Sequence, residues 1–235
     1  MSKKIAIITG GSRGIGRAIA EKFAAQGFDI VLSARDAQAL EEAKDFIETK
    51  FQVKCFIKSA DLSQKAEVLA LGKWIVSLQQ EIAVLVNNAG IFLPGNIHEE
   101  QDGVLEKLIE TNLYSAYYLT RSIIPSLVHQ KAGHIFNVCS VASLKAYPNG
   151  GSYSISKFAL LGFSKGLREE LKNDGIKVTS LIPGAVYTDS WSGAGIPEDR
   201  FMSVQDVADV TWNAFSLSKN ALIEEIVLRP LSGDI

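Results

Sequence analysis

Short apolar runs rich in valine and isoleucine alternate along this chain with longer stretches in which apolar and polar positions follow a helical period. Runs of this length and composition are typical of strands that a parallel sheet buries on both faces. The pattern predicts seven strands, at residues 5–8, 30–32, 53–57, 82–86, 134–138, 178–182 and 223–228.

Six amphipathic stretches separate these strands. They predict helices over residues 15–26, 37–49, the segment after Ser63, residues 101–128, residues 153–174 and the segment after Ser203. Asp36 is suited to begin the second helix, and Gly27 and Gly175 are suited to end the first and the fifth. Because parallel strands need crossover helices, the alternation predicts an α/β fold with a doubly wound, parallel, seven-stranded sheet flanked by helices.

The length and composition fit a globular protein. The chain has 235 residues, of which 47% are hydrophobic and 21% charged. This is enough to bury a substantial core. No internal repeat and no second set of elements interrupts the pattern, so residues 1–235 are expected to form a single domain.

The charge balance argues against several classes of partner. Lys and Arg number 24 and Asp and Glu 26, which gives a net charge of −2, so no strong attraction to nucleic acid or to an anionic membrane is expected. No apolar run approaches the ~20 residues of a membrane helix, and the first one is too short for a signal peptide. Two cysteines and three scattered histidines predict neither a disulfide framework nor a metal site. We expect a cytoplasmic protein.

A glycine-rich segment, Thr-Gly-Gly-Ser-Arg-Gly-Ile-Gly, follows the first predicted strand at residues 9–16. Glycines let the backbone turn tightly and approach a pyrophosphate, and the start of the next helix supplies N–H donors and a favourable dipole. A dinucleotide site is therefore expected here. Its candidate residues are Gly10, Ser12, Arg13, Gly14, Ile15 and Gly16.

Further motifs follow in order: Asn-Asn-Ala-Gly at residues 87–90, Ser140, Tyr-Ser-Ile-Ser-Lys at residues 153–157, and Pro183-Gly184. Together with the glycine segment they resemble the short-chain dehydrogenase/reductase family over essentially the whole chain. The resemblance implies a Rossmann-type, NAD(P)-binding domain and an oxidoreductase that acts on carbonyl or alcohol groups. It also implies a homodimer or homotetramer formed through the helices around Asn112 and Tyr153.

The residue types fit carbonyl reduction, which delivers a hydride to carbon and a proton to oxygen. Tyr153 and Lys157 are four residues apart and share a helix face. A phenol with a pKa of ~10 is a weak acid–base group at neutral pH, and a nearby ammonium lowers that pKa. We expect Tyr153 to act as general acid, Lys157 to lower its pKa, and Ser140 to hydrogen-bond the substrate oxygen.

The resemblance assigns further roles. Asn112 would be a fourth catalytic residue, holding a water that links Lys157 to solvent; the alternative is a polar side chain that satisfies the helix backbone. Lys157 would also bind the nicotinamide ribose. The remaining cofactor candidates are Asp61, Leu62, Asn88, Ala89, Gly90, Tyr153, Pro183, Gly184, Val186 and Thr188. For Asp61, the alternative is a helix-capping carboxylate.

In NAD-using relatives an acidic residue stands at the end of the second strand, a position that Ala34 occupies here. Arg35 and Arg13 could instead clamp a 2′-phosphate, which favours NADP(H). Asp36 competes as a ribose-binding acid, because it lies 20 residues after Gly16. We interpret it as the N-cap of the next helix.

The last twelve residues, and the segment from Gly184 to Trp191, resemble bacterial sepiapterin reductases, which points to a pterin side-chain carbonyl as substrate. Trp191 could stack on a pterin and Asp234 could accept from its donor-rich edge. Alternatively, Trp191 anchors its loop and Asp234 is a solvated end. The loops at residues 91–100, 141–152 and 184–203 are expected to select the substrate, a small carbonyl compound.

Two other functions stay open. One is reduction of 3-oxoacyl thioesters or of ketones in general, for which Lys145 and Arg200 are the basic residues expected near a carrier protein. The other is NADP sensing without turnover, against which the intact set of Ser140, Tyr153 and Lys157 argues.

Overall fold

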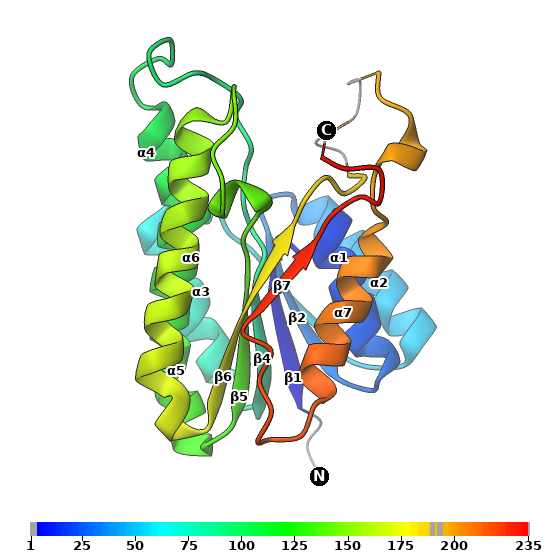
Figure 1. Cartoon of the computed structure of the whole chain (residues 1–235). Helices are drawn as coiled ribbons and strands as arrows, with labels where there is room; N and C mark the ends of the chain where they lie inside the picture. The colour runs from blue at the N-terminus through cyan, green and yellow to red at the C-terminus, as the bar shows by residue number, and fades with distance from the viewer. Residues whose placement is uncertain (1–3, 189–190, 192–194, 235) are drawn as a thin grey trace.

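A computed structural model describes residues 4–188, 191 and 195–234. Seven strands form one sheet in the order β3-β2-β1-β4-β5-β6-β7, and every pairing is parallel (Figure 1). The strands are β1 (Ile5–Thr9), β2 (Asp29–Ala34), β3 (Cys55–Ser59), β4 (Ile82–Asn87), β5 (Gly133–Val138), β6 (Ile176–Pro183) and β7 (Glu225–Leu228). The order changes direction between β1 and β4, which is the switch point of a doubly wound sheet.

Helices cover both faces of the sheet (Figure 1). On one face lie α1 (Gly14–Ala25), α2 (Ala37–Phe51) and α7 (Val204–Ser216). On the other lie α3 (Lys65–Ser77), α4 (Val104–Ile109), α5 (Ser115–Gln130) and α6 (Gly151–Leu171). Each layer packs against its own side of the central strands, which explains why β1 and β4 are buried along their whole length.

The predicted α/β fold with a seven-stranded parallel sheet is confirmed, and several boundaries differ. The strand expected from residue 53 pairs only from Cys55, and the last strand pairs only from Glu225. The helix expected over residues 101–128 begins at Val104, because Gly103 precedes it in a left-handed conformation with φ 91°. The same region contains a π-helical turn, η1 (Glu110–Tyr114), between α4 and α5.

The loops that we expect to select the substrate lie at the carboxyl ends of the strands. These loops and the C-terminal tail lie at the same end of the molecule, opposite the start of β1 (Figure 1). Within the expected substrate loop at residues 184–203, residues 189–190 and 192–194 lie outside the described part of the chain. Among the helices that the structure describes, none is long and apolar enough to cross a membrane.

Candidate active site

A cavity of about 740 Å³ lies at the carboxyl edge of the sheet, where the loops after β1, β4, β5 and β6 meet the C-terminal tail. This is the edge at which doubly wound sheets bind ligands. Predicted site residues in its wall are Arg13, Gly14, Ile15, Asn88, Gly90, Ser140, Tyr153, Lys157, Pro183, Gly184, Val186, Thr188, Trp191 and Asp234. Predicted residues outside its wall are Gly10, Ser12, Gly16, Arg35, Asp61, Leu62, Ala89 and Asn112.

The glycine segment forms the turn between β1 and α1. Gly14 has φ 55°, a left-handed conformation that favours glycine. A Cβ on Gly10 would lie 2.9 Å from the Asn88 side-chain nitrogen, and a Cβ on Gly16 would overlap the same atom. The first turn of α1 contains no acidic residue, so its N–H groups and helix dipole present a positive end. A cradle that side chains would fill, at such a helix end, fits the pyrophosphate of a dinucleotide.

Asn88 holds this turn in place. Its side-chain nitrogen donates to the carbonyl oxygens of Thr9 at 2.9 Å and Gly10 at 3.1 Å. In return, the Thr9 hydroxyl accepts from the backbone N–H groups of Asn88 and Ala89, each at 3.0 Å. The loop after β4 therefore holds the glycine turn in place, and the side-chain nitrogen of Asn88 is engaged within the protein.

Helix α6 places Tyr153 and Lys157 on one face within its first two turns. The Lys157 ammonium lies 5.8 Å from the centre of the Tyr153 ring and donates to the Val138 carbonyl oxygen at 2.9 Å. Ser140 follows β5, and its hydroxyl accepts from the Ala142 N–H at 3.1 Å. This hydroxyl is also within hydrogen-bonding reach of the Tyr153 phenol. The three groups expected to act on a carbonyl thus face one space.

Burial controls the protonation of these groups. It raises the pKa of Tyr153, and the Ser140 hydrogen bond offsets this effect in part. Burial also lowers the pKa of Lys157. We expected Lys157 to lower the pKa of Tyr153, but Lys157 is not among the groups that shift this pKa in the protein alone. The net pKa shift is upward because desolvation of the phenolate outweighs the Ser140 hydrogen bond, while the Lys157 ammonium is directed toward the Val138 carbonyl.

Asn112 lies in the π-helical turn η1, outside the cavity wall. Its Oδ1 accepts from the Ile91 N–H at 2.8 Å, and its Nδ2 donates to the Ile91 carbonyl oxygen and to the Ser156 hydroxyl, each at 3.0 Å. π-helical turns within helices are frequent at functional sites. The side chain therefore joins the loop after β4 to α6 through Ser156, one residue before Lys157.

The expected cofactor-selecting residues lie at the end of β2 and on the glycine turn. Asp36 accepts from the Ala39 N–H at 3.0 Å and is the N-cap of α2, as expected. It also pairs with the guanidinium of Arg13 at 2.8 Å, with both side chains about half exposed. The Asp36 carboxylate therefore points at Arg13. A cofactor 2′-phosphate bound here would share the Arg13 guanidinium with Asp36.

Asp61 follows β3 and is largely committed to its own turn. It accepts from the N–H and the hydroxyl of Ser63, at 3.0 and 2.8 Å. These bonds, together with the nearby Arg35, hold the pKa of the Asp61 carboxyl below its usual range. These bonds stabilise the turn before α3 but do not cap that helix, whose N-cap residue is Gln64, and Arg35 lies close to the Asp61 carboxylate.

The substrate side of the cavity contains Trp191 and Asp234. The Trp191 ring also packs on Phe201, with ring centres 5.1 Å apart, so it anchors its loop as well as lining the cavity. Asp234 forms an ion pair with Arg229, which lines the cavity too. Among the described residues, no group of three His, Cys, Asp or Glu side chains is arranged to hold a metal ion.

Phe92, Tyr147 and Arg229 also line the cavity, although the sequence pattern did not indicate them. The Phe92 ring packs edge-on against Tyr153, with ring centres 4.9 Å apart. Burial and the nearby Tyr153 raise the pKa of Tyr147 to about 12, so its phenol stays neutral. These residues lie on loops and near the C-terminus, where no periodicity marks a side chain as facing a site.

Comparisons with known proteins identify the family. The model of the short chain dehydrogenase family matches residues 4–198. A sepiapterin reductase of Chlorobaculum tepidum is 34% identical over 248 aligned residues, covering 99% of this chain and 98% of the relative. An uncharacterized oxidoreductase of Staphylococcus saprophyticus is 31% identical and covers 98% of this chain and 99% of the relative.

Solved structures show the same fold. A metagenomic short-chain oxidoreductase in complex with NADP superposes with a TM-score of 0.85 at 30% identity, covering 97% of each chain. The L-sorbose reductase of Gluconobacter frateurii, complexed with NADPH and L-sorbose, has a TM-score of 0.90 at 28% identity and covers 97% of this chain and 96% of its own. Because the family match and the relatives span nearly all of its length, the chain belongs to the short-chain dehydrogenase/reductase family of oxidoreductases.

Proposed function

We propose that this chain is a single-domain, NADPH-dependent carbonyl reductase in which Tyr153 is the general acid. One observation carries the proposal: Ser140, Tyr153 and Lys157 line the same cavity as the glycine turn that fits a dinucleotide. A solved relative holds NADP and another holds NADPH beside a sugar substrate, which supports the same cofactor for this chain.

The protein's own groups divide the work. NADPH supplies the hydride when it is bound. The Ser140 hydroxyl orients the carbonyl oxygen, and the Tyr153 phenol donates the proton to it. Lys157 would hold the nicotinamide ribose, and in its charged form it would favour the phenolate that remains after proton donation. Asn112 keeps the loop after β4 against α6. Holding these groups together is the main contribution of the protein.

Burial of Tyr153 has a consequence for this role. A raised pKa keeps the phenol protonated at neutral pH, which suits donation of a proton in the direction of reduction. Oxidation of an alcohol needs the phenolate instead. We therefore expect the oxidation rate to rise with pH over a range in which the reduction rate is flat or falls.

For the substrate, we propose a sepiapterin-like pterin carbonyl. The support is the likeness to the Chlorobaculum sepiapterin reductase and an aromatic cavity wall that includes Trp191 and Tyr147. Asp234 is expected to accept hydrogen bonds from the pterin, but it also forms an ion pair with Arg229. One carboxylate oxygen is engaged by Arg229, so the donor-rich edge of a pterin would have to add to this ion pair.

A panel of carbonyl compounds tests the activity. NADPH oxidation is measured with sepiapterin, small vicinal dicarbonyls and an acetoacetyl thioester. A higher kcat/KM for sepiapterin supports the pterin proposal, and a higher value for the thioester favours the 3-oxoacyl alternative. The Tyr153→Phe variant should lose about 10²- to 10⁴-fold in kcat. Full activity of this variant with every carbonyl would disprove the mechanism.

A stacking role for Trp191 has its own test. Trp191→Ala should raise KM for the pterin at least about ten-fold more than for a small diketone, because only the pterin offers a large flat ring. The ratio of the two KM changes is the measurement. Equal changes for both substrates would show that Trp191 acts on its loop alone.

We also propose a homo-oligomer formed through α4, η1, α5 and α6. Exposed large apolar side chains gather on this layer: Leu105, Tyr114, Tyr117, Ile155 and Phe158. Such a concentration is typical of protein interfaces. Light scattering coupled to gel filtration, on the native chain and on Phe158→Glu, distinguishes a dimer or tetramer from a monomer. A cytoplasmic location remains a prediction.

A further inference from the structure

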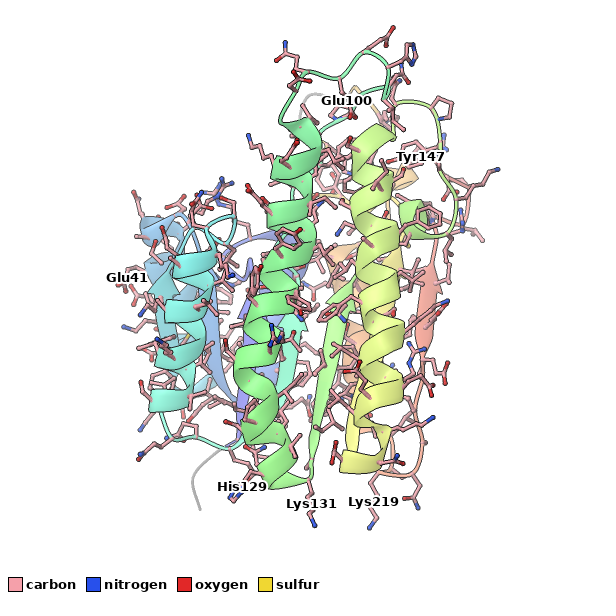
Figure 2. The ribbon with its side chains drawn as sticks, turned by 90° about the vertical axis from the view of Figure 1, so that its left-hand side faces the viewer. Glu41, Glu100, His129, Lys131, Tyr147 and Lys219 are labelled. Atoms are coloured by element: carbon pink, nitrogen blue, oxygen red, sulfur yellow. The ribbon has the colours of Figure 1, made fainter. Side chains whose placement is uncertain are left out.

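The carboxylate of Glu100 reaches from the end of the loop at residues 91–100 to the first turn of α6. It accepts from the Ser152 N–H at 3.0 Å and from the Ser152 hydroxyl. Figure 2 shows Glu100 beside the upper end of α6, near the loop that carries Tyr147. The residue that follows Ser152 in the helix is Tyr153.

This helix needs a cap from elsewhere in the chain. Its N-cap residue is Gly150, which has no side chain to offer, and its first turn contains no acidic residue. The first N–H groups of a helix have no partner within the helix, and a negative charge is stabilised at this end by the helix dipole. Glu100 supplies both the acceptor and the charge.

The backbone on both sides is shaped to admit this carboxylate. A Cβ on Gly151 would overlap the Glu100 carboxylate and would lie 2.5 Å from the Gly95 carbonyl oxygen. A Cβ on Gly95 would lie 2.9 Å from the Glu100 Cγ. The Gly95 N–H donates to the Asn149 carbonyl oxygen at 3.0 Å, which draws the loop against the start of α6.

The same loop touches the catalytic tyrosine directly. The Phe92 ring packs edge-on against Tyr153, with ring centres 4.9 Å apart. Asn112 holds the beginning of the loop through both backbone groups of Ile91. Glu100 holds its end. The loop is therefore fixed at both ends as well as at Gly95, and between Ile91 and Gly95 it supports the Tyr153 ring.

We propose that Glu100 is a positioning residue for the general acid: its carboxylate fixes the first turn of α6 and the Phe92 loop together, and so sets the position of the Tyr153 phenol. This inference rests on the proposed function, because it assumes that Tyr153 donates the proton. Glu100 itself lies outside the cavity wall, so it acts through Tyr153 and does not touch the substrate.

Three variants test the proposal on the full-length protein. Glu100→Ala removes the cap. Glu100→Gln keeps an acceptor for the Ser152 N–H and a partner for its hydroxyl. Asp102→Ala is the matched control, since this exposed carboxylate of the same segment makes no hydrogen bond or ion pair with the residues that the structure describes. Each is assayed with the best carbonyl of the panel.

Glu100→Ala should lower kcat by about 10- to 100-fold, the range expected when a reacting group is displaced by about 1 Å. The Kd for NADPH, measured by fluorescence, should stay within about two-fold, because the glycine turn is untouched. The solvent deuterium isotope effect on kcat should increase, since proton donation becomes slower than hydride transfer. Glu100→Gln should recover activity to within about three-fold, and Asp102→Ala should match the native chain. A merely structural role would not change the isotope effect.

Wild-type activity in Glu100→Ala, or a Glu100→Gln variant as impaired as Glu100→Ala, would overturn the inference. If the native chain reduces none of the carbonyls, the proposed function fails, and hydrogen exchange tests the positioning separately. Amides of residues 151–156 should then exchange at least about ten-fold faster in Glu100→Ala and at the native rate in Asp102→Ala. Unchanged protection in Glu100→Ala would overturn the inference in that case too.

Discussion

At the scale of the residue, the polar side chains of the site divide by what else they contact. Asn88 is committed to Thr9 and Gly10, and Asp61 to Ser63. Both residues match a cofactor site by sequence, but the side-chain nitrogen of Asn88 and one carboxylate oxygen of Asp61 are already engaged within the protein. Arg13 lies in the cavity wall and already pairs with Asp36 at 2.8 Å. Its role is decided by competition between Asp36 and a phosphate.

Arg13→Ala should weaken NADPH binding by about 10- to 100-fold and leave NADH binding nearly unchanged. The physical reason is the loss of a charge-assisted hydrogen bond to the 2′-phosphate, which contributes about 1.5–3 kcal/mol. Fluorescence titration with both cofactors measures the two Kd values. Equal weakening of NADH and NADPH would contradict a phosphate-binding role.

Asp36→Asn tests the competing interpretation of the same site. Asparagine keeps the helix cap but removes the charge that pairs with Arg13. We expect NADPH to bind at least as tightly as in the native chain, since a like charge near the phosphate is gone. A large loss of NADH affinity would instead identify Asp36 as a ribose-binding acid.

At the scale of the element, packing between distant helices holds the glycine turn in place. Helix α1 begins at that turn and packs against α7, which comes nearly two hundred residues later. Phe23 of α1 is fully buried, and its ring meets those of Phe28, Trp212 and Phe215 at centre distances of 5.5, 5.4 and 5.1 Å. The direction of α1, and with it the phosphate-binding end, depends on this aromatic cluster.

Phe23→Ala should lower the free energy of unfolding by about 3–5 kcal/mol, because it leaves a cavity among these rings. Urea unfolding followed by tryptophan fluorescence measures the loss, since Trp212 belongs to the cluster. Phe46→Ala is the control: this ring is 42% exposed, and its removal should cost less than about 1.5 kcal/mol. Equal losses in the two variants would contradict the role of the cluster.

At the scale of the whole molecule, the sheet order brings loops far apart in sequence to one edge. The last strands are joined in addition by a buried hydrogen-bonded chain. His134 of β5 shares a hydrogen bond of 2.8 Å with the Thr179 hydroxyl of β6, which donates to the Ile223 carbonyl oxygen at 2.6 Å. The His134 Nδ1 has no partner within the described residues. Burial lowers the pKa of His134 to about 3, so the ring is neutral in the folded protein.

This histidine should make the fold acid-sensitive. Its pKa is about 6.5 in the unfolded chain and about 3 in the folded one, so the unfolded state binds the extra proton between these values. His134 therefore does not lower the free energy of unfolding above pH 6.5. Below pH 6.5 it lowers this free energy by up to about 1.4 kcal/mol per pH unit. Urea unfolding at pH 7.5 and 5.0 measures the difference. His134→Gln should show a shallower dependence on pH; an unchanged slope would contradict this origin.

The sequence alone determined the class of fold and most of the chemistry. Buried parallel strands must be apolar along their length, and crossover helices must be amphipathic, so hydrophobic patterning is sufficient to predict seven strands and their helices. The glycine turn and the Tyr153–Lys157 pair are local in sequence, and local motifs are visible without a structure. The π-helical turn at Asn112 could not be predicted from the sequence. The Asn112 side chain is bonded to Ile91 in the loop after β4, which is a contact between separate segments.

The tertiary structure decided everything that depends on two distant segments meeting. The C-terminal Arg229 and Asp234 at the cavity, Phe92 against Tyr153, and Glu100 on the first turn of α6 have no signature in the linear pattern. The direction of the pKa shift of Tyr153 also came only from the structure, because desolvation depends on how tightly the surrounding loops close. The periodicity of apolar positions indicates which side of a helix or strand faces the core. It does not indicate which loops meet above the sheet.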